Sequence, residues 1–387
     1  MKILVYKWDI YSYDDIIQTL KKQGHQVDVL AFPIYNHMED AAFEAVFHQK
    51  LKKTAYELVF SVNYYAVIAV ICEQHKLPYA SWTCDSPLLS LQHPSVYSPY
   101  NYIFLFDYKE YQTLLQRAVP HVYYLPLAGL CLDTSFFVTE NTDYAYDISF
   151  VGNLYDKNRY DEMCYYLPEY LCGYMDAAIE AQKNVSGGNL LPQMLHDDIL
   201  ADLSQYAVVA NGTSSLEELR MHFATTVLSY KTAADIRTDA LNLLATNYDT
   251  HLFTTSQGER LERVVMHPAV EYHTDMPQVF HDSKINLNFT LPNIENGIPL
   301  RVFDILASGG FLLTDYREEL CRQFKNGTDL VVFDGLADLK QKAAYYLIHD
   351  EERTIIAKNG QEKVQQLHQY DMRLKKILHI IFSDINS

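Results

Sequence analysis

The stretch from Ser283 to Tyr316 constrains the fold more than any other part of the chain. Ile285 to Thr290 is a short run of β-type residues, and Leu300 to Ala307 carries apolar residues at helical spacing. A Gly-Gly pair ends this helical pattern, and Phe311 to Thr314 begins a second strand. Strand, loop, helix and strand in this order predict a βαβ unit of a parallel sheet, and hence an α/β fold.

Polar side chains occupy this βαβ unit at positions where α/β proteins bind ligands. Asn286, Asn288 and Thr290 interrupt a strand that should be nearly all apolar if both of its faces are buried. Arg301 and Asp304 share one face of the following helix, near its start. At the carboxyl ends of parallel strands, a carboxylate can bind ribose hydroxyls and an Arg beside a helix N-terminus can bind phosphate. The alternative for this pair is an ion pair on a solvated helix face.

The 387 residues suffice for two domains. We predict an N-terminal Rossmann-like domain over residues 1–140, in which six strands alternate with helices. No glycine-rich fingerprint follows its first strand, where the sequence reads Lys7-Trp8-Asp9-Ile10. A nucleotide is therefore expected in the second half of the chain.

We predict a second Rossmann-like domain over residues 146–365, with the boundary near Phe137 to Ala145. Its first strand, Asp147 to Val151, ends in Gly152-Asn153, and a further strand is expected at Val270 to His273. Residues 156–248 are mostly helical in pattern, which indicates a helical insertion between strands.

Several of these segments resemble one family. They read S-K-I-N-L-N from Ser283, G-I-P-L-R-V-F-D from Gly297, G-G-F-L-L-T from Gly309, W-T-C-D-S-P from Trp82, L-P-L-A from Leu125 and F-V-G-N from Phe150. Together they resemble the CgeB-like, or spore-maturation-protein-like, glycosyltransferases. The resemblance implies the GT-B fold, in which two Rossmann-like domains face each other across a cleft. It also implies that residues 366–387 form a C-terminal helix that crosses back to the N-terminal, acceptor-side domain.

Such an enzyme would move a sugar from a nucleoside-diphosphate sugar to a hydroxyl of a polysaccharide, glycan or protein, as hexosyltransferases do. A UDP-sugar is favoured over a GDP- or dTDP-sugar, and no cofactor is expected. Two alternatives stay open. One is a sugar-nucleotide epimerase, which can share the fold, and the other is a catalytically inactive sugar-nucleotide-binding module.

The donor pyrophosphate needs close backbone approach and positive charge. Gly152 and Asn153 end a strand, so their backbone could approach a phosphate. The candidate cations are Lys157, Arg159, Lys284 and Arg301, and they would act without a metal because the sequence has no D-x-D motif. An ordinary turn glycine and solvated surface charges are the alternative interpretation of these residues.

The nucleoside would lie beside another loop. His273 and Thr274 follow a predicted strand and could border the base, although His273 also fits an ordinary loop. Retaining enzymes of this fold carry two Glu eight residues apart, of which the second binds ribose. Asp304 matches the second position, but Asn296 stands at the first and Glu295 is one residue away. This departure leaves the retaining or inverting outcome open.

An inverting enzyme needs a base on the acceptor side. Asp85, at the end of the predicted fourth strand, is the first candidate, and Arg301 would stabilise the leaving group. The alternative for Asp85 is an Asp that caps the turn before Ser86-Pro87. Asp9 and His93 are second choices for the base.

Charge and composition exclude other classes of protein. Against 31 Lys and Arg stand 49 Asp and Glu, and the net charge of −18 disfavours nucleic acid and anionic lipid as partners. No apolar run reaches the roughly 18 residues of a transmembrane helix, which leaves only peripheral membrane contact open. The first residues turn polar too early for a signal peptide, so we expect a cytoplasmic protein. The six cysteines form no C-x-x-C pair, and no metal site is expected.

Overall fold

A computed structural model describes residues 1–8, 12–130, 132, 144–206 and 215–385. The chain divides into two compact units. The first contains Met1–Cys131, Gly297–Phe303 and Val364–Ser387, and the second contains Leu132–Asn296 and Asp304–Lys363. The predicted boundary near Phe137 lies outside the described residues.

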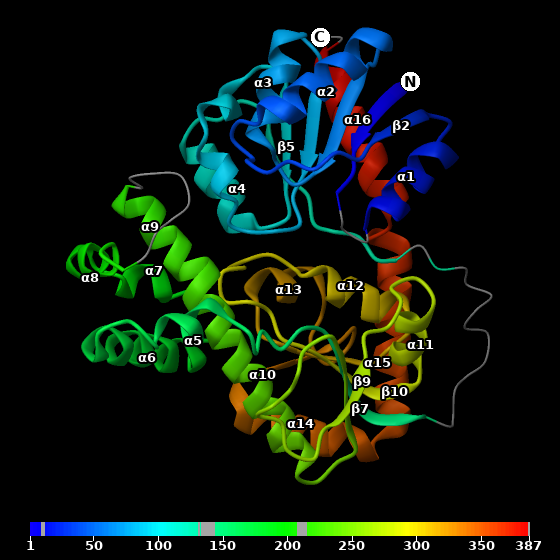
Figure 1. Ribbon diagram of the computed structural model, residues 1–387. Coiled ribbons are helices and arrows are strands. Elements are labelled where there is room, and N and C mark those ends of the chain that lie inside the picture. The colour runs from blue at the N-terminus through cyan, green and yellow to red at the C-terminus, as the bar shows by residue number, and fades with distance from the viewer. Residues whose placement is uncertain (9–11, 131, 133–143, 207–214, 386–387) are drawn as a thin grey trace. The chain divides into compact units, whose positions relative to one another are not determined.

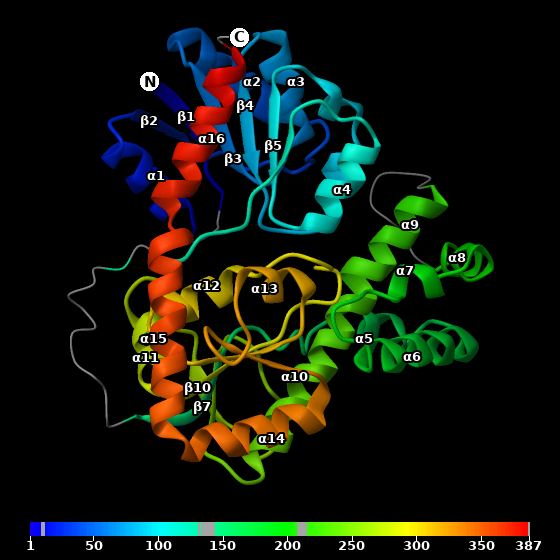
Figure 2. The ribbon, with the colours of Figure 1, turned by 180° about the vertical axis from the view of Figure 1, so that it is seen from behind.

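The first unit is built on a six-stranded parallel sheet in the order β2-β1-β3-β4-β5-β6. α2 and α3 cover one face of this sheet, and α1 packs against α16 on the other (Figures 1 and 2). Right-handed crossovers require this arrangement, because the path from β1 to β2 runs opposite to the path from β3 to β6. The elements are β1 (Lys2–Tyr6), α1 (Ser12–Lys22), β2 (Gln26–Leu30), α2 (Ala41–Lys53), β3 (Leu58–Val62), α3 (Ala66–Gln74), β4 (Tyr79–Trp82), η1 (Leu89–Gln92), η2 (Pro94–Tyr97), β5 (Asn101–Leu105), α4 (Tyr108–Gln116), β6 (Val122–Tyr124) and α16 (Tyr370–Ile385).

The second unit has its own six-stranded parallel sheet, in the order β12-β11-β10-β7-β8-β9. Its core includes apolar side chains of α10 and α14 packed on the strands. The elements are β7 (Tyr146–Val151), β8 (Thr250–Thr254), β9 (Val265–Pro268), α11 (Asp275–His281), β10 (Ser283–Asn288), α12 (Leu300–Ala307), β11 (Leu312–Asp315), α13 (Glu318–Gln323), β12 (Val331–Phe333), α14 (Gly335–Ile348) and α15 (Asp350–Leu367).

The described residues between β7 and β8 are mostly helical. The helices are α5 (Arg159–Met163), α6 (Glu169–Lys183), α7 (Leu191–Met194), α8 (Asp197–Leu203), α9 (Leu216–His222), a π-helical segment (Phe223–Leu228) and α10 (Ser229–Ala245). Most of these helices share a hydrophobic core that is separate from the core of the sheet. Among the described helices of the insertion, α10 contributes apolar side chains to the core of the sheet, which attaches the insertion to the second unit (Figure 1).

The α/β fold class is confirmed in both units, and β10, α12 and β11 form the predicted βαβ segment. One predicted strand is wrong. Residues 270–273 form no strand, because the Glu271 carboxylate accepts hydrogen bonds from the amides of His273 and Thr274 (both 2.8 Å) just before α11. The strand at this edge is β9, which ends five residues earlier in the chain than the predicted strand. Among the described residues, no helix is both long and apolar enough to cross a membrane.

Candidate functional site

The strand order of the second sheet reverses between β7 and β10. From β7 the chain continues to β8 and β9 on one side, and then to β10, β11 and β12 on the other. Ligands of open parallel sheets bind at such a switch point, outside the carboxyl ends of the strands. The loops at this point begin with Gly152-Asn153 after β7 and with Phe289-Thr290 after β10.

Arg237 of α10 joins the two loops at the switch point. Its guanidinium donates to the backbone carbonyl of Asn153 and to that of Phe289 (2.8 Å). The same group lies 4.8 Å from the ring centre of Tyr155 and 5.4 Å from that of Phe150. Arg237 is only 7% exposed, so a positive charge is held between the two loops at the switch point.

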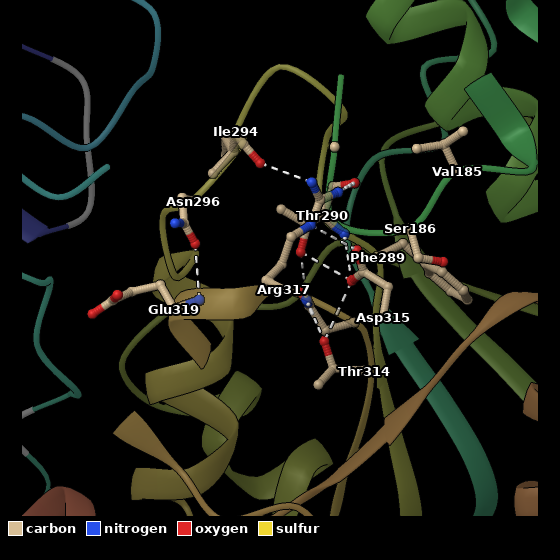
Figure 3. Close-up of polar contacts among 12 residues, drawn as sticks. Val185, Ser186, Phe289, Thr290, Ile294, Asn296, Thr314, Asp315, Arg317 and Glu319 are labelled. Atoms are coloured by element: carbon tan, nitrogen blue, oxygen red, sulfur yellow. Dashed lines mark hydrogen bonds and ion pairs between the residues drawn. The ribbon is translucent and has the colours of Figure 1, made fainter. Parts of the chain in front are cut away.

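A second buried arginine shapes the loop that follows β10 (Figure 3). Arg317 donates to the carbonyls of Ile294 (2.9 Å) and Thr290 (3.3 Å), and it forms an ion pair with Asp315 at 3.2 Å. Asp315 in turn accepts hydrogen bonds from the amide and hydroxyl of Thr290, both at 2.9 Å. The loop is therefore fixed by charge-assisted hydrogen bonds at both of its ends.

The insertion contributes a third loop to this edge. The Ser186 hydroxyl donates to Asp334, which follows β12, at 2.6 Å. Gly187 has φ +71°, and a Cβ atom there would lie 2.8 Å from the ring of Tyr316. Glycine is needed at this position because any other side chain would be strained and would displace the ring.

Asp304 has a different environment from the one the sequence predicted. The residue is only 1% exposed, and both of its oxygens accept a hydrogen bond from the Tyr272 hydroxyl at 3.1 Å. The carboxylate is therefore covered by the Tyr272 side chain, and ribose binding by Asp304 stays a prediction. His273 and Thr274 directly follow Tyr272, so the structure brings these two predicted residues close to a third, Asp304.

Asn288 is also a structural residue. It is 4% exposed and donates to the Thr314 hydroxyl at 2.9 Å, so it links the ends of β10 and β11. Asn286 is fully buried, accepts from Ser149 at 2.9 Å and links β10 to β7. The polar residues that interrupt this strand therefore bond to neighbouring strands.

Lys284 is not part of the candidate site. It lies at the amino end of β10 and forms an ion pair with Asp147, at the amino end of β7, at 2.7 Å. Arg159 is exposed at the start of α5, where its guanidinium lies 3.4 Å from His222. Gly152 and Asn153 follow β7 as predicted, and Arg301 is half-buried in the first turn of α12.

The first sheet has a switch point of its own, between β1 and β3. Asn63 follows β3 there, and its amide nitrogen donates to the Asp85 carboxylate at 2.7 Å. Its amide oxygen accepts from the backbone amides of Cys84 (2.9 Å) and Asp85 (3.2 Å). The predicted base therefore lies at the carboxyl edge of the first sheet, in a loop that a buried side chain holds in place.

Two carboxyl groups at this edge hold protons more tightly than usual. Asp85 keeps an exposed surface, yet burial of its carboxylate raises its pKa, and the hydrogen bond from Asn63 opposes the rise. Glu110 of α4 accepts from the Leu88 amide at 3.0 Å, and burial raises its pKa to about 8. Of the second choices, His93 accepts from the Ser95 amide at 3.1 Å, and Asp9 lies outside the described residues.

Sequence reasoning missed Arg237 and Arg317. Arg237 had a detectable signal, because it stands in the apolar stripe of α10 with Ala233, Ala240 and Leu244. A charge at such a position must find buried partners. Arg317 had no comparable signal, since its partners lie on a loop that precedes it by more than twenty residues.

Comparison with known proteins connects these features to one kind of fold. Residues 229–379 match a family model described as glycosyl transferase-like, and this range includes Arg237, Asp304, Asp315 and Arg317. No curated protein sequence matches the chain. Among the residues that the structure describes, no group of three or more His, Cys, Asp or Glu is placed to hold a metal ion.

Solved structures match nearly the whole chain at low identity. A sucrose-phosphate synthase from Thermosynechococcus elongatus is 10% identical, with a TM-score of 0.52 over 99% of this chain and 100% of its own. HepE from Anabaena, in complex with UDP-glucose, is 13% identical with a TM-score of 0.52 over 99% and 100%. A Listeria monocytogenes protein provisionally named UDP-N-acetylglucosamine 2-epimerase is 9% identical, with 0.52 over 100% and 96%. The two α/β units are those of GT-B glycosyltransferase structures.

Proposed function

We propose that the protein is a glycosyltransferase that moves a sugar from a nucleoside-diphosphate sugar to an acceptor hydroxyl. The observation that carries the proposal is the carboxyl edge of the second sheet, where Arg237 and Arg317 fix the loops at the switch point. Both arginines fall within residues 229–379, the range that matches the glycosyl transferase-like family model. A polysaccharide, a glycan or a protein is the proposed class of acceptor.

A UDP-sugar is the proposed donor. Support comes from the structural neighbour HepE, whose structure is a complex with UDP-glucose. In this chain the pyrophosphate would meet Gly152 and Asn153 above the buried Arg237, and the nucleoside would border the loop that carries His273 and Thr274. Positive charge beneath a loop of backbone amides is a suitable environment for a diphosphate.

The proposed chemistry is a single displacement. The Asp85 carboxylate takes the proton of the acceptor hydroxyl, and the acceptor oxygen forms a bond to the anomeric carbon. The bond from that carbon to the β-phosphate oxygen breaks, and the nucleoside diphosphate leaves with the electron pair. Arg301 would donate hydrogen bonds to the β-phosphate as its negative charge grows.

Metal independence is part of the proposal, because the sequence has no D-x-D motif. We expect turnover to survive EDTA, since guanidinium groups and helix dipoles would neutralise the leaving group. Loss of turnover in EDTA that Mg²⁺ or Mn²⁺ restores would contradict this part of the proposal.

The test of the function combines binding with product analysis. We expect calorimetry to detect UDP binding, and we expect UDP release from UDP-glucose to increase when a hydroxyl acceptor is added. An epimerase, the alternative favoured by the Listeria neighbour, would change the configuration of the sugar without adding it to an acceptor. UDP binding without any turnover would instead indicate an inactive binding module.

A further inference from the structure

Asn63 has an unusual backbone conformation for a buried residue. Its φ is +63°, although it carries a side chain, and it is only 4% exposed. Asn tolerates this left-handed region better than most residues, but the conformation still costs energy that other contacts must offset. The Ser61 hydroxyl donates to the Asn63 carbonyl at 2.6 Å, and the Asn63 amide donates to the Trp82 carbonyl at 3.0 Å. These contacts hold the turn after β3 against the end of β4.

The Asn63 side chain contacts the loop that carries Asp85 through both its amide oxygen and its amide nitrogen. The amide oxygen accepts hydrogen bonds from the backbone amides of Cys84 and Asp85, and these bonds fix the course of the loop. The amide nitrogen donates to one carboxylate oxygen of Asp85 at 2.7 Å, which fixes the rotation of that carboxyl group. A loop anchor alone would need only the amide oxygen. The second contact is directed at the functional group itself.

Burial favours the protonated form of Asp85. The negative charge of Asp85 in turn raises the pKa of the Cys84 thiol in the same loop and that of the Glu110 carboxyl group of α4. Asp107, at the start of α4, acts on Glu110 in the same direction. Against the effect of burial on Asp85, the Asn63 amide is a donor that stabilises the carboxylate form.

We propose that Asn63 is a positioning residue that holds the Asp85 carboxylate ionised and aimed at the acceptor hydroxyl. This inference rests on the proposed function, because it takes Asp85 as the base. Asn63 itself touches no reacting atom in this account. It acts by fixing one carboxylate oxygen, which leaves the other oxygen of Asp85 available to the acceptor.

The variant Asn63→Gly tests the inference, because glycine adopts φ +63° without strain and removes only the side-chain contacts. Carboxyl ¹³C NMR of Asp-labelled full-length protein reports the titration of Asp85, identified by the signal that Asp85→Asn lacks. We expect the midpoint to rise by about one pKa unit, a tenfold gain in proton affinity, when a hydrogen bond to the carboxylate is lost. With UDP-glucose as the probe, the acid limb of kcat/KM for UDP release should move by the same amount, while KM for the donor stays unchanged.

Asn101→Gly is the matched control. Asn101 is another buried asparagine of the first unit, but it lies at the amino end of β5 and donates to Tyr64 and Ser95. Both variants should lose stability, and only Asn63→Gly should change the titration of Asp85. If Asn63→Gly does not fold, Asn63→Asp retains the acceptor oxygen, removes the donor and adds a negative charge, so the acid limb should move further upward.

Three results would decide the matter. An unchanged Asp85 midpoint in both Asn63 variants would overturn the inference, because the contact would then have no effect on the carboxylate. A shifted midpoint with an unchanged acid limb would overturn its catalytic part. Absence of UDP release from wild-type protein would count against the proposed function, while the NMR titration would still report whether Asn63 holds Asp85.

Discussion

The carboxyl edges of the two sheets are built around opposite charges. At the first edge, an uncharged side chain, Asn63, holds a carboxylate whose pKa is raised. At the second edge, two buried guanidinium groups, Arg237 and Arg317, hold backbone carbonyls. Both edges are switch points of parallel sheets with similar strand orders, so topology alone does not distinguish them.

The difference teaches what each edge is suited to bind. A carboxylate with a raised pKa accepts a proton more readily than an ordinary one, which suits removal of a proton from a hydroxyl. Fixed positive charge beneath a loop suits a diphosphate, which carries negative charge at every pH of interest. Under the proposed function, proton transfer therefore belongs to the first edge and charge neutralisation to the second.

Removing the carboxylate should have the largest effect on this comparison. Asp85→Asn keeps the shape of the side chain and loses the base, so kcat should fall by about 10²–10⁴. UDP affinity, measured by calorimetry, should not change. Asp384→Asn is the control, because Asp384 accepts from Tyr102 at the amino end of the same sheet. A near-normal kcat for Asp85→Asn would remove the proposed distinction between the edges.

Arg301→Lys tests whether the leaving group needs a guanidinium. Lys keeps the charge but cannot offer two parallel donors, so kcat should fall by about 10²–10³ while UDP binding persists. Steady-state kinetics with UDP-glucose measures both. A wild-type kcat would show that Arg301 is an ordinary surface cation, whose ion pairs are worth about 0.2–1 kcal/mol.

The fold was largely predictable because its signals are local. Runs of apolar residues and a Gly-Gly pair at the end of the helix indicate β10, α12 and β11. Gly310 is required because a Cβ atom there would lie 2.7 Å from Asn286. β9 was missed for a physical reason. It is a largely exposed edge strand that ends in proline, so its sequence shows no apolar alternation.

The site was less predictable because its contacts join residues far apart in sequence. Asp304 is covered by Tyr272, thirty-two residues earlier, and Lys284 was assigned to the wrong end of its strand. Asp85 was placed correctly at a strand end by its position alone, but its partner Asn63 belongs to another strand. Such pairs follow from the strand order, which a single sequence does not specify.

Arg237→Lys tests the second edge, and its expected effect is smaller than those of Asp85→Asn and Arg301→Lys. A lysine cannot donate to both loop carbonyls in the same geometry, so the variant leaves at least one buried carbonyl without its donor. We expect a loss of about 1–3 kcal/mol in unfolding free energy and a weaker affinity for UDP. Denaturant titration and calorimetry measure the two effects. Arg260→Lys is the control, since Arg260 pairs with Asp235 at a half-exposed position.

Glu110→Gln tests the first edge through the pH dependence of the free energy of unfolding. For a change of one pH unit, this is the smallest of the expected effects. The pKa of Glu110 is about 8 in the folded protein, above the ordinary value of 4.5, so the folded state binds more protons between these two values. The stability that this proton contributes is complete below pH 4.5 and is lost as pH rises to 8. Relative to wild type, Glu110→Gln should therefore gain about 1.4 kcal/mol per pH unit across this window.

Gln keeps the oxygen that accepts from Leu88, so the variant isolates the titration from the contact. Urea unfolding at pH 5, 6, 7 and 8 gives the slope, and Glu73→Gln, at an exposed position of α3, should follow wild type. Parallel curves for wild type and Glu110→Gln would mean that Glu110 is ionised throughout. Asp85 would then lie near a second negative charge, that of Glu110. Repulsion as well as burial would then raise the pKa of Asp85.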